Sequence, residues 1–142
     1  MYQVNGLPAW QAQRVTSFVA ENLDRRLTVA ELAKCVHLSD GQFCRVFKRT
    51  FGVTAHLYVI RSRIKAAQEL MLSSGMTLSE IAVCCGMSDQ SHFTRWFRRV
   101  VGETPHSWRR RHPHPPVEHW RLRATGCERV PPLAGAQALQ RR

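Results

Sequence analysis

Residues 77–108 read TLSEIAVCCGMSDQSHFTRWFRRVVGETPHSW, and residues 28–58 read TVAELAKCVHLSDGQFCRVFKRTFGVTAHLY. Identical residues recur in the same order along both stretches. Their offset is 49 residues up to Ser39/Ser88 and 50 residues from Phe43/Phe93 onward. A repeat that keeps its register over a whole stretch predicts two copies of one supersecondary unit, the second copy holding one inserted residue.

Each copy is predicted to begin with a short helix and a tight turn. Thr28-x-x-Glu31 and Thr77-x-x-Glu80 have the capping-box pattern, in which the Thr oxygen accepts an early backbone N–H and the Glu reaches back. About two helical turns follow. Leu32, Ala33, Ile81 and Ala82 are expected to face inward, and His37 and Gly86, which tolerate positive φ better than most residues, are expected in the turns.

The second helix of each copy is predicted to be amphipathic and basic. Ser39 and Ser88 precede these helices, Ser39-x-x-Gln42 is another capping box, and Gly52 and Gly102 stand where a glycine ends a helix. The apolar stripes are Phe43, Val46 and Phe47 in one copy and Phe93, Trp96 and Phe97 in the other. The four phenylalanines are expected to form core and not to stack on bases, whereas the place of Trp96 is left open because its partner Val46 is small. The opposite faces carry Arg45, Lys48, Arg49, Arg95, Arg98 and Arg99.

The flanking segments complete an all-α, homeodomain-like tandem helix-turn-helix fold of about seven helices. A first helix is expected over 8–23, a long linker helix over 55–72 with Thr54 as N-cap, and a last short helix from Thr104-Pro105. We find no strand pattern. The expected division is 1–53 for the first helix and first subdomain, 54–75 for the linker helix, 76–110 for the second subdomain and 111–142 for a disordered basic tail rich in Pro and Arg.

Composition narrows the class of protein. The chain has 142 residues, 44% of them hydrophobic, and shows neither a membrane span nor a secretory signal, so a cytoplasmic location is expected. The formal net charge of +11 favours a polyanionic partner, nucleic acid before an anionic membrane. The sequence shows no pattern of catalytic residues, so an enzyme is not expected.

The cysteines and the C-terminal histidines suggest weaker alternatives. Cys84 and Cys85 could sense redox state, although adjacent cysteines at a buried helix end favour packing, and Cys44 is the thiol expected to be most exposed. The spacing of His112, His114, His119 and Cys127 fits no standard zinc pattern, so no metal and no cofactor are expected.

The chain resembles the AraC/XylS family of transcription regulators over residues 8–110. The resemblance rests on 81–110, IAVCCGMSDQSHFTRWFRRVVGETPHSWRR, and on RIKAA at 63–67 in the linker helix. Met87, Trp96 and Ala55 depart from the family pattern. The resemblance implies two helix-turn-helix subdomains whose second helices enter successive major grooves. Because few residues precede the first helix, the short, stand-alone members of the family are the nearest comparison.

The resemblance also implies which side chains contact DNA. The residues that it implies contact bases are Gln42, Cys44, Arg45, Gln90, Ser91, His92, Thr94 and Arg95. The residues that it implies contact phosphates are Ser39, Lys48, Arg49, Ser88, Arg98 and Arg99. Arg45 and Arg95 are the strongest candidates, because Arg pairs bidentately with guanine.

The resulting hypothesis is a sequence-specific regulator that binds double-stranded promoter DNA as a monomer, is associated with the nucleoid when bound, and recruits or blocks RNA polymerase. The main alternative is a non-specific architectural or RNA-binding protein that acts through its basic tail. A second alternative is an adaptor whose helix faces bind protein, which the paired Arg45 and Arg95 disfavour.

Overall fold

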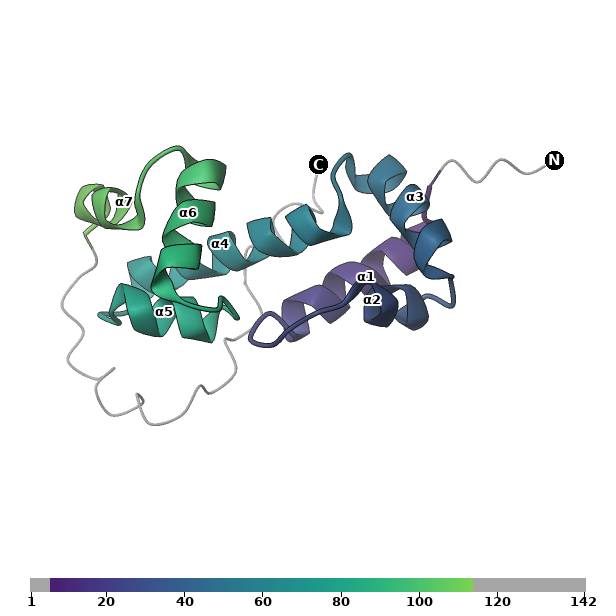
Figure 1. The fold of residues 1–142 in the computed structure, drawn as a ribbon, viewed down its shortest axis with the longest axis horizontal. Helices are drawn as coiled ribbons and strands as arrows, with labels where there is room; N and C mark the ends of the chain where they lie inside the picture. The colour runs from purple at the N-terminus through teal and green to yellow at the C-terminus, as the bar shows by residue number, and fades with distance from the viewer. Residues whose placement is uncertain (1–5, 114–142) are drawn as a thin grey trace. The chain divides into compact units, whose positions relative to one another are not determined.

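The computed structural model describes residues 6–113, and the regular structure in that range is entirely helical. It forms two compact units that meet between Arg63 and Ile64, within α4. The helices are α1 (Ala9–Glu21), α2 (Val29–Cys35), α3 (Asp40–Phe51), α4 (Ala55–Ser73), α5 (Leu78–Cys84), α6 (Gln90–Val101) and α7 (Pro105–Arg111) (Figure 1). The all-α prediction with seven helices is confirmed for this range. Of the predicted basic tail, residues 114–142 lie outside the described residues.

Capping boxes begin α2 and α5, as predicted. The Thr28 hydroxyl accepts the Glu31 N–H at 3.2 Å, and the Glu31 carboxylate accepts the Thr28 N–H at 2.9 Å. In α5 the matching distances between Thr77 and Glu80 are 3.2 and 2.7 Å. The backbone N–H that each carboxylate accepts is the main reason why the pKa of Glu31 and the pKa of Glu80 lie below their ordinary value.

The core of the first unit gathers around the aromatic residues of α3. Phe43 and Phe47 are fully buried, with ring centroids 5.3 Å apart, and Phe47 meets the half-buried Tyr58 edge-on at 5.4 Å. The cluster is completed by Leu7, Val15, Val19, Leu32, Ala33, Val36, Ala55 and Val59. Leu32 and Ala33 of α2 are therefore buried as predicted, and α3 packs into the core through the face that carries Phe43 and Phe47.

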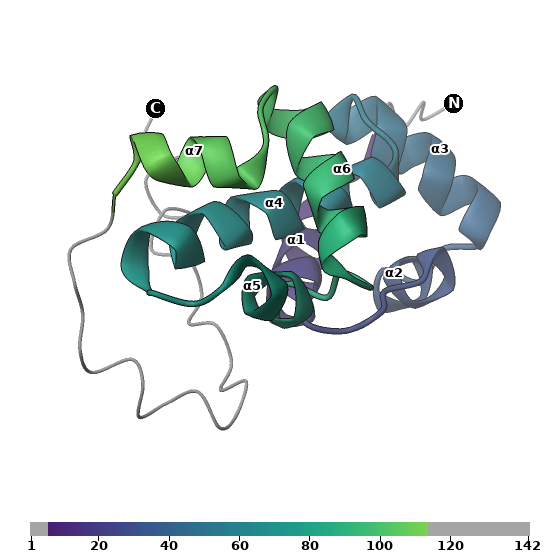
Figure 2. The ribbon, with the colours of Figure 1, turned by 60° about the vertical axis from the view of Figure 1, so that its left-hand side comes forward.

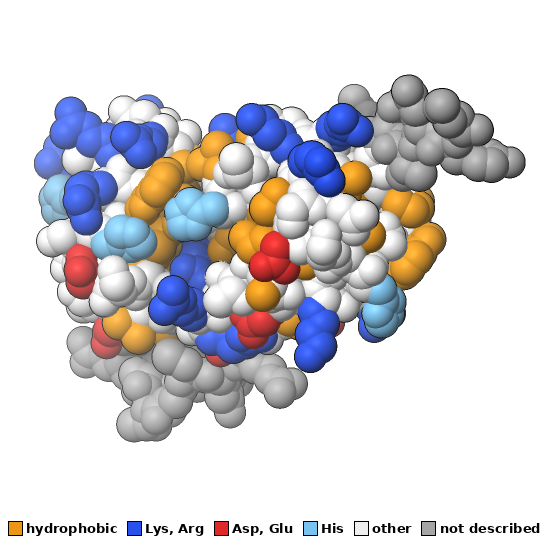
Figure 3. Space-filling model, turned by 45° about the vertical axis from the view of Figure 1, so that its right-hand side comes forward, with side chains coloured by type: hydrophobic (Ala, Val, Ile, Leu, Met, Phe, Trp, Pro, Cys, Tyr) orange, Lys and Arg blue, Asp and Glu red, His pale blue; other side chains and the backbone are white. Residues whose placement is uncertain are grey.

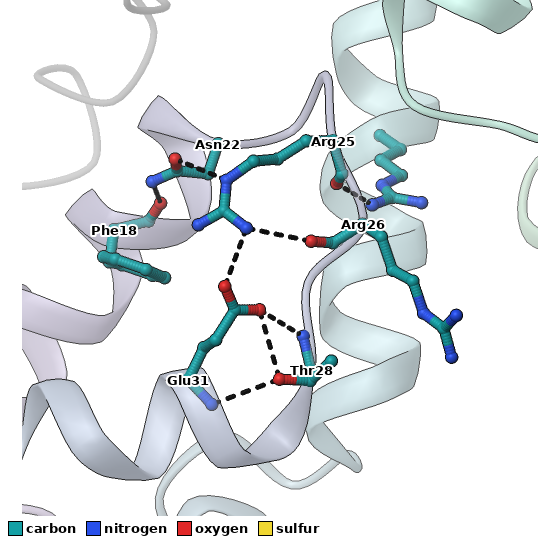
Figure 4. A network of polar contacts seen from close by, with 7 residues as sticks. Phe18, Asn22, Arg25, Arg26, Thr28 and Glu31 are labelled. Atoms are coloured by element: carbon teal, nitrogen blue, oxygen red, sulfur yellow. Dashed lines mark hydrogen bonds and ion pairs between the residues drawn. The ribbon is translucent and has the colours of Figure 1, made fainter.

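A polar network orders the loop between α1 and α2 (Figure 4). Arg25 donates to the Asn22 side chain at 3.0 Å and pairs with Glu31 at 2.8 Å, while Asn22 donates to the Phe18 carbonyl at 2.8 Å. Arg63, a residue only 8% exposed, donates from its guanidinium to the Arg25 carbonyl at 2.7 Å. This loop is thereby tied to the N-terminus of α2 and to α4, which steadies the helix that supports α3.

In the second unit, α5 and α7 pack against α6 (Figures 1 and 2). Phe93 and Phe97 are fully buried with centroids 5.6 Å apart, and Phe97 meets Trp108 of α7 at 6.0 Å. Arg109 donates to the Ser74 carbonyl at 3.2 Å, and burial lowers the pKa of its guanidinium. The buried side chains of the unit also include Ala66, Ala67, Met71, Ile81, Ala82, Cys85, Met87 and Pro105.

The caps of α3, α4, α6 and α7 follow the predictions. Gly52 ends α3 with φ of 75° and Gly102 ends α6 with φ of 96°, both in the left-handed region. Thr54 caps α4 through the Leu57 N–H at 3.2 Å. Thr104 caps α7 through the Ser107 N–H at 3.2 Å, with Pro105 in the first turn.

Gly102→Ala and Gly41→Ala test the role of the left-handed cap. A Cβ at either glycine would meet nothing within 4 Å, so the two sites differ only in backbone conformation. We expect Gly102→Ala to lower the free energy of unfolding by about 1–2 kcal/mol, and Gly41→Ala, inside α3, to raise it by about 0.5 kcal/mol. Urea denaturation monitored by circular dichroism measures both; equal effects would contradict the assignment.

The pH dependence of stability tests the capping boxes. Because folding lowers the pKa of Glu80, its stabilisation should be complete above the ordinary value of 4.5 and be lost as the pH falls through the lower pKa of the folded state. Glu80→Gln keeps an acceptor but carries no charge. The difference in free energy of unfolding between the two proteins should therefore shrink from about pH 6 to about pH 3. Glu31→Gln should behave alike, and a constant difference would refute the charge effect.

Candidate nucleic-acid interface

Each unit contains a short helix, a tight turn and a longer helix. His37 (φ 58°) and Gly86 (φ 74°) take the left-handed conformation in the two turns, as predicted. Behind them the Leu38 N–H donates to the Ala33 carbonyl at 3.0 Å, and the Met87 N–H donates to the Ala82 carbonyl at 2.9 Å. These bonds close the ends of α2 and α5 and turn the chain sharply toward α3 and α6. The two motifs are helix-turn-helix units, and we call α3 and α6 the recognition helices.

The inserted residue of the second unit lies in its turn. Ser39 is the N-cap of α3, whereas Asp89, not Ser88, is the N-cap of α6, its carboxylate accepting the His92 N–H at 2.7 Å. The sequence pairing of Ser39 with Ser88 is therefore wrong in structural terms. Local identity is ambiguous here because Ser and Asp are equally good caps. His92, and not Gln90, is thus the counterpart of Gln42.

Burial of two phenylalanines fixes which face of each recognition helix is outward. The predicted phosphate contacts Ser39, Lys48, Arg49, Ser88, Arg98 and Arg99 are all exposed. Of the predicted base readers, Gln42, Cys44, Arg45, Gln90, Ser91 and Arg95 are exposed, and His92 and Thr94 are half-buried. The predicted contacts of both sets are therefore open to solvent, His92 and Thr94 only in part.

The positive charge on these faces is not neutralised by acidic side chains. In the part of the chain that the structure describes, the ion pairs are Arg25–Glu31 and Arg111–Glu103, and neither involves a residue of α3 or α6. Arg45 and Arg95 accordingly project from equivalent positions without a carboxylate partner among residues 6–113. On the face in Figure 3, Lys and Arg side chains are more prominent than Asp and Glu. Such surfaces attract polyanions.

Some predicted base readers are engaged within the protein. The Gln42 side-chain oxygen accepts the Ser39 N–H at 3.4 Å and the Ser39 hydroxyl at 3.1 Å, which confirms the third capping box. The Gln90 oxygen accepts the Ser79 hydroxyl at 2.6 Å, which ties α6 to α5. Contact of either glutamine with a base would compete with these bonds.

The structure settles the place of Trp96 in α6, which its spacing had left open between core and surface. Its indole N–H donates to His92 at 3.1 Å, and its ring lies 5.3 Å from the guanidinium of Arg99. Trp96 is only half-buried, so it borders the outer face. His92, Trp96 and Arg99 are four and three residues apart, and this spacing in the sequence could have predicted that they lie on one side of a helix.

The remaining predictions concern metals, membranes and thiols. Among residues 6–113, no group of three or more His, Cys, Asp or Glu side chains is placed to hold a metal ion. His114, His119 and Cys127 lie outside this range. The described part of the chain contains no helix with the length and apolar content that a membrane span requires. Cys44 is exposed, as predicted, and Cys85 is buried.

Comparison with known proteins identifies the motif pair. A family model described as a helix-turn-helix domain matches residues 32–111. The probable transcriptional regulator LumQ of Photobacterium leiognathi is 36% identical over 91 residues, which are 64% of this chain and 37% of LumQ. The chain thus spans little more than a third of the length of that relative.

Solved structures agree with this fold. A transcriptional regulator from Chromobacterium violaceum with an AraC-type DNA-binding domain superposes with a TM-score of 0.69 at 24% identity, over 75% of this chain and 95% of that chain. The DNA-binding domain of the transcriptional factor AdpA, solved with a target DNA, superposes with a TM-score of 0.67 at 26% identity, over 82% of this chain and 97% of that chain. The chain therefore belongs to the AraC-type family of helix-turn-helix DNA-binding proteins.

Proposed function

We propose that this protein is a sequence-specific transcription regulator whose two recognition helices read successive major grooves of a promoter site. The observation that carries the proposal is the pair Arg45 and Arg95. They project from the same position of two capped helices and lack acidic partners among the described residues. The AdpA domain, 26% identical to this chain, was solved with a target DNA, which supports the same role here.

The chemistry of the outer faces suits such readout. A major groove admits one α-helix, and an Arg fork matches the O6 and N7 acceptors of guanine. Arg45 and Arg95 are proposed to make this contact, flanked by Gln42, Cys44, Gln90, Ser91, His92 and Thr94. Lys48, Arg49, Arg98 and Arg99 lie nearer the C-terminal ends of the helices and, with Ser39 and Ser88, are assigned to phosphates. Phosphate contacts fix the position of the protein on DNA, and base contacts select the sequence.

The mode of binding follows from having two different recognition helices in one chain. Many helix-turn-helix regulators obtain a second reading helix by dimerising, which requires a palindromic site. Here α3 and α6 share Arg45 and Arg95 but differ at the other proposed base-reading positions, so one chain bound to one asymmetric site is proposed. At a promoter, this complex would recruit or block RNA polymerase.

Selection of bound sites from random double-stranded DNA tests the proposal directly. We expect one asymmetric motif that spans two major grooves, bound by a single protein chain in sedimentation measurements. Affinity for this motif should exceed that for scrambled DNA by roughly a thousandfold or more. Failure to enrich any motif would instead indicate binding through charge alone, and a palindrome bound by two chains would overturn the monomeric mode.

Substitutions within the recognition helices should separate reading from positioning. Arg45→Ala and Arg95→Ala should each cost about 1–3 kcal/mol on the selected site and relax the preference for one base pair. Lys48→Ala and Arg98→Ala should weaken binding to all sequences alike and lower the salt slope by about one. Affinities for selected and scrambled DNA at several salt concentrations measure both effects. If Arg95→Ala weakens both DNAs equally, Arg95 contacts phosphate and not a base.

A further inference from the structure

Three side chains form a continuous group along one edge of α6. His92, Trp96 and Arg99 stand four and three residues apart, the spacing that places side chains on the same side of a helix. Trp96 Nε1 lies 3.1 Å from His92 Nε2, and the Arg99 guanidinium carbon lies 5.3 Å from the centroid of the Trp96 ring. Trp96 therefore contacts both a proposed base reader and a proposed phosphate contact.

The bond to Trp96 fixes the tautomer of His92. An indole N–H can only donate, so His92 Nε2 must be the acceptor, and in the neutral ring the hydrogen then resides on Nδ1. Nδ1 is itself buried and has no hydrogen-bond partner among the described residues. One ring nitrogen is thus occupied and the other enclosed. The half-buried ring consequently presents carbon, and no donor or acceptor, to its surroundings.

The described part of the first unit has no equivalent of the His92–Trp96 hydrogen bond. Gln42 holds the position equivalent to His92, and its side chain returns to Ser39 at the N-terminus of α3. The counterpart of Trp96 is Val46, which has no polar atom to offer. In α6 the N-cap is Asp89, which binds the His92 backbone N–H and leaves the ring to bond with Trp96. The two recognition helices therefore hold the same position in different ways.

We propose that Trp96 is a positioning residue for DNA readout by α6. Its N–H holds the His92 ring so that His92 meets the groove as a shape-defining apolar contact, while its ring supports the Arg99 guanidinium for a phosphate. The proposal rests on the proposed function of α6. A preorganised contact loses less side-chain freedom on binding, which sharpens the choice between base pairs.

Trp96→Phe removes the N–H and keeps an aromatic ring beneath Arg99. We expect the ratio of affinities for selected and scrambled DNA to fall by roughly two- to tenfold, the range for loss of one orienting hydrogen bond. Site selection with the variant should relax the preference at the base pair next to His92 and at no other. Trp96→Val, which installs the residue of the first unit, should further weaken binding to every sequence by roughly two- to fivefold through loss of the cation–π contact.

Trp10→Phe is the matched control, because Trp10 is 56% exposed on α1 and outside the recognition helices. It should leave both affinities unchanged. Thermal unfolding of each variant verifies that the fold is retained. In a double-mutant cycle, adding Trp96→Phe to His92→Ala should cost no further discrimination, since Trp96 acts on base choice through His92.

Nitrogen-15 chemical shifts of the His92 ring supply a readout that a purely structural role would not alter. The unmodified protein should show the hydrogen on Nδ1, and Trp96→Phe should move it toward Nε2 or a mixture. The proposal is overturned if His92 carries its hydrogen on Nε2 in the unmodified protein, or if Trp96→Phe discriminates as well as Trp10→Phe. If the unmodified protein selects no site at all, the proposed function itself fails and this proposal fails with it.

Discussion

Burial of two phenylalanines, one helical turn apart, is the constraint on which each recognition helix depends. Phe43 and Phe47 in α3, and Phe93 and Phe97 in α6, have no exposed surface. Large aromatic side chains gain most from leaving water, so the rotation of each helix about its own axis is set by this pair. Once these rings are inside, Arg45 and Arg95 must point outward. The outward face is therefore a consequence of the core.

The turns and caps then determine where each recognition helix begins. A left-handed residue closes the preceding helix, and a Ser or Asp side chain opens the next one. The second unit absorbs its extra residue between these two points, so α6 begins at the same distance from its phenylalanines as α3 does. An insertion inside the helix would instead have rotated the outer face by about 100°. The basic residues remain in register because the turn, and not the helix, takes up the difference.

The two units have similar helix-turn-helix structures but different outward side chains. The third residue is Gln42 in α3 and His92 in α6. The Gln42 side chain is hydrogen-bonded to Ser39, and the His92 side chain is hydrogen-bonded to Trp96. The buried phenylalanines, turns and caps make the two motifs similar in structure. The outer residues that differ give each recognition helix its own chemistry. Two unlike reading surfaces in one chain are the physical basis for proposing an asymmetric DNA site.

Residue spacing was enough to predict the helical class, the repeat, the caps at Thr28 and Thr77, and the buried phenylalanines, because these depend on local spacing and on the cost of exposing apolar surface. It also placed Arg45 and Arg95 on the outer faces, since a residue two positions beyond a buried one lies across the helix. Identity alone paired Ser39 with Ser88, where the structure pairs it with Asp89, and it left the place of Trp96 open. Only the tertiary structure could settle these two points, because a cap is chosen by backbone geometry and the partner of a half-buried indole is chosen by the packing around it.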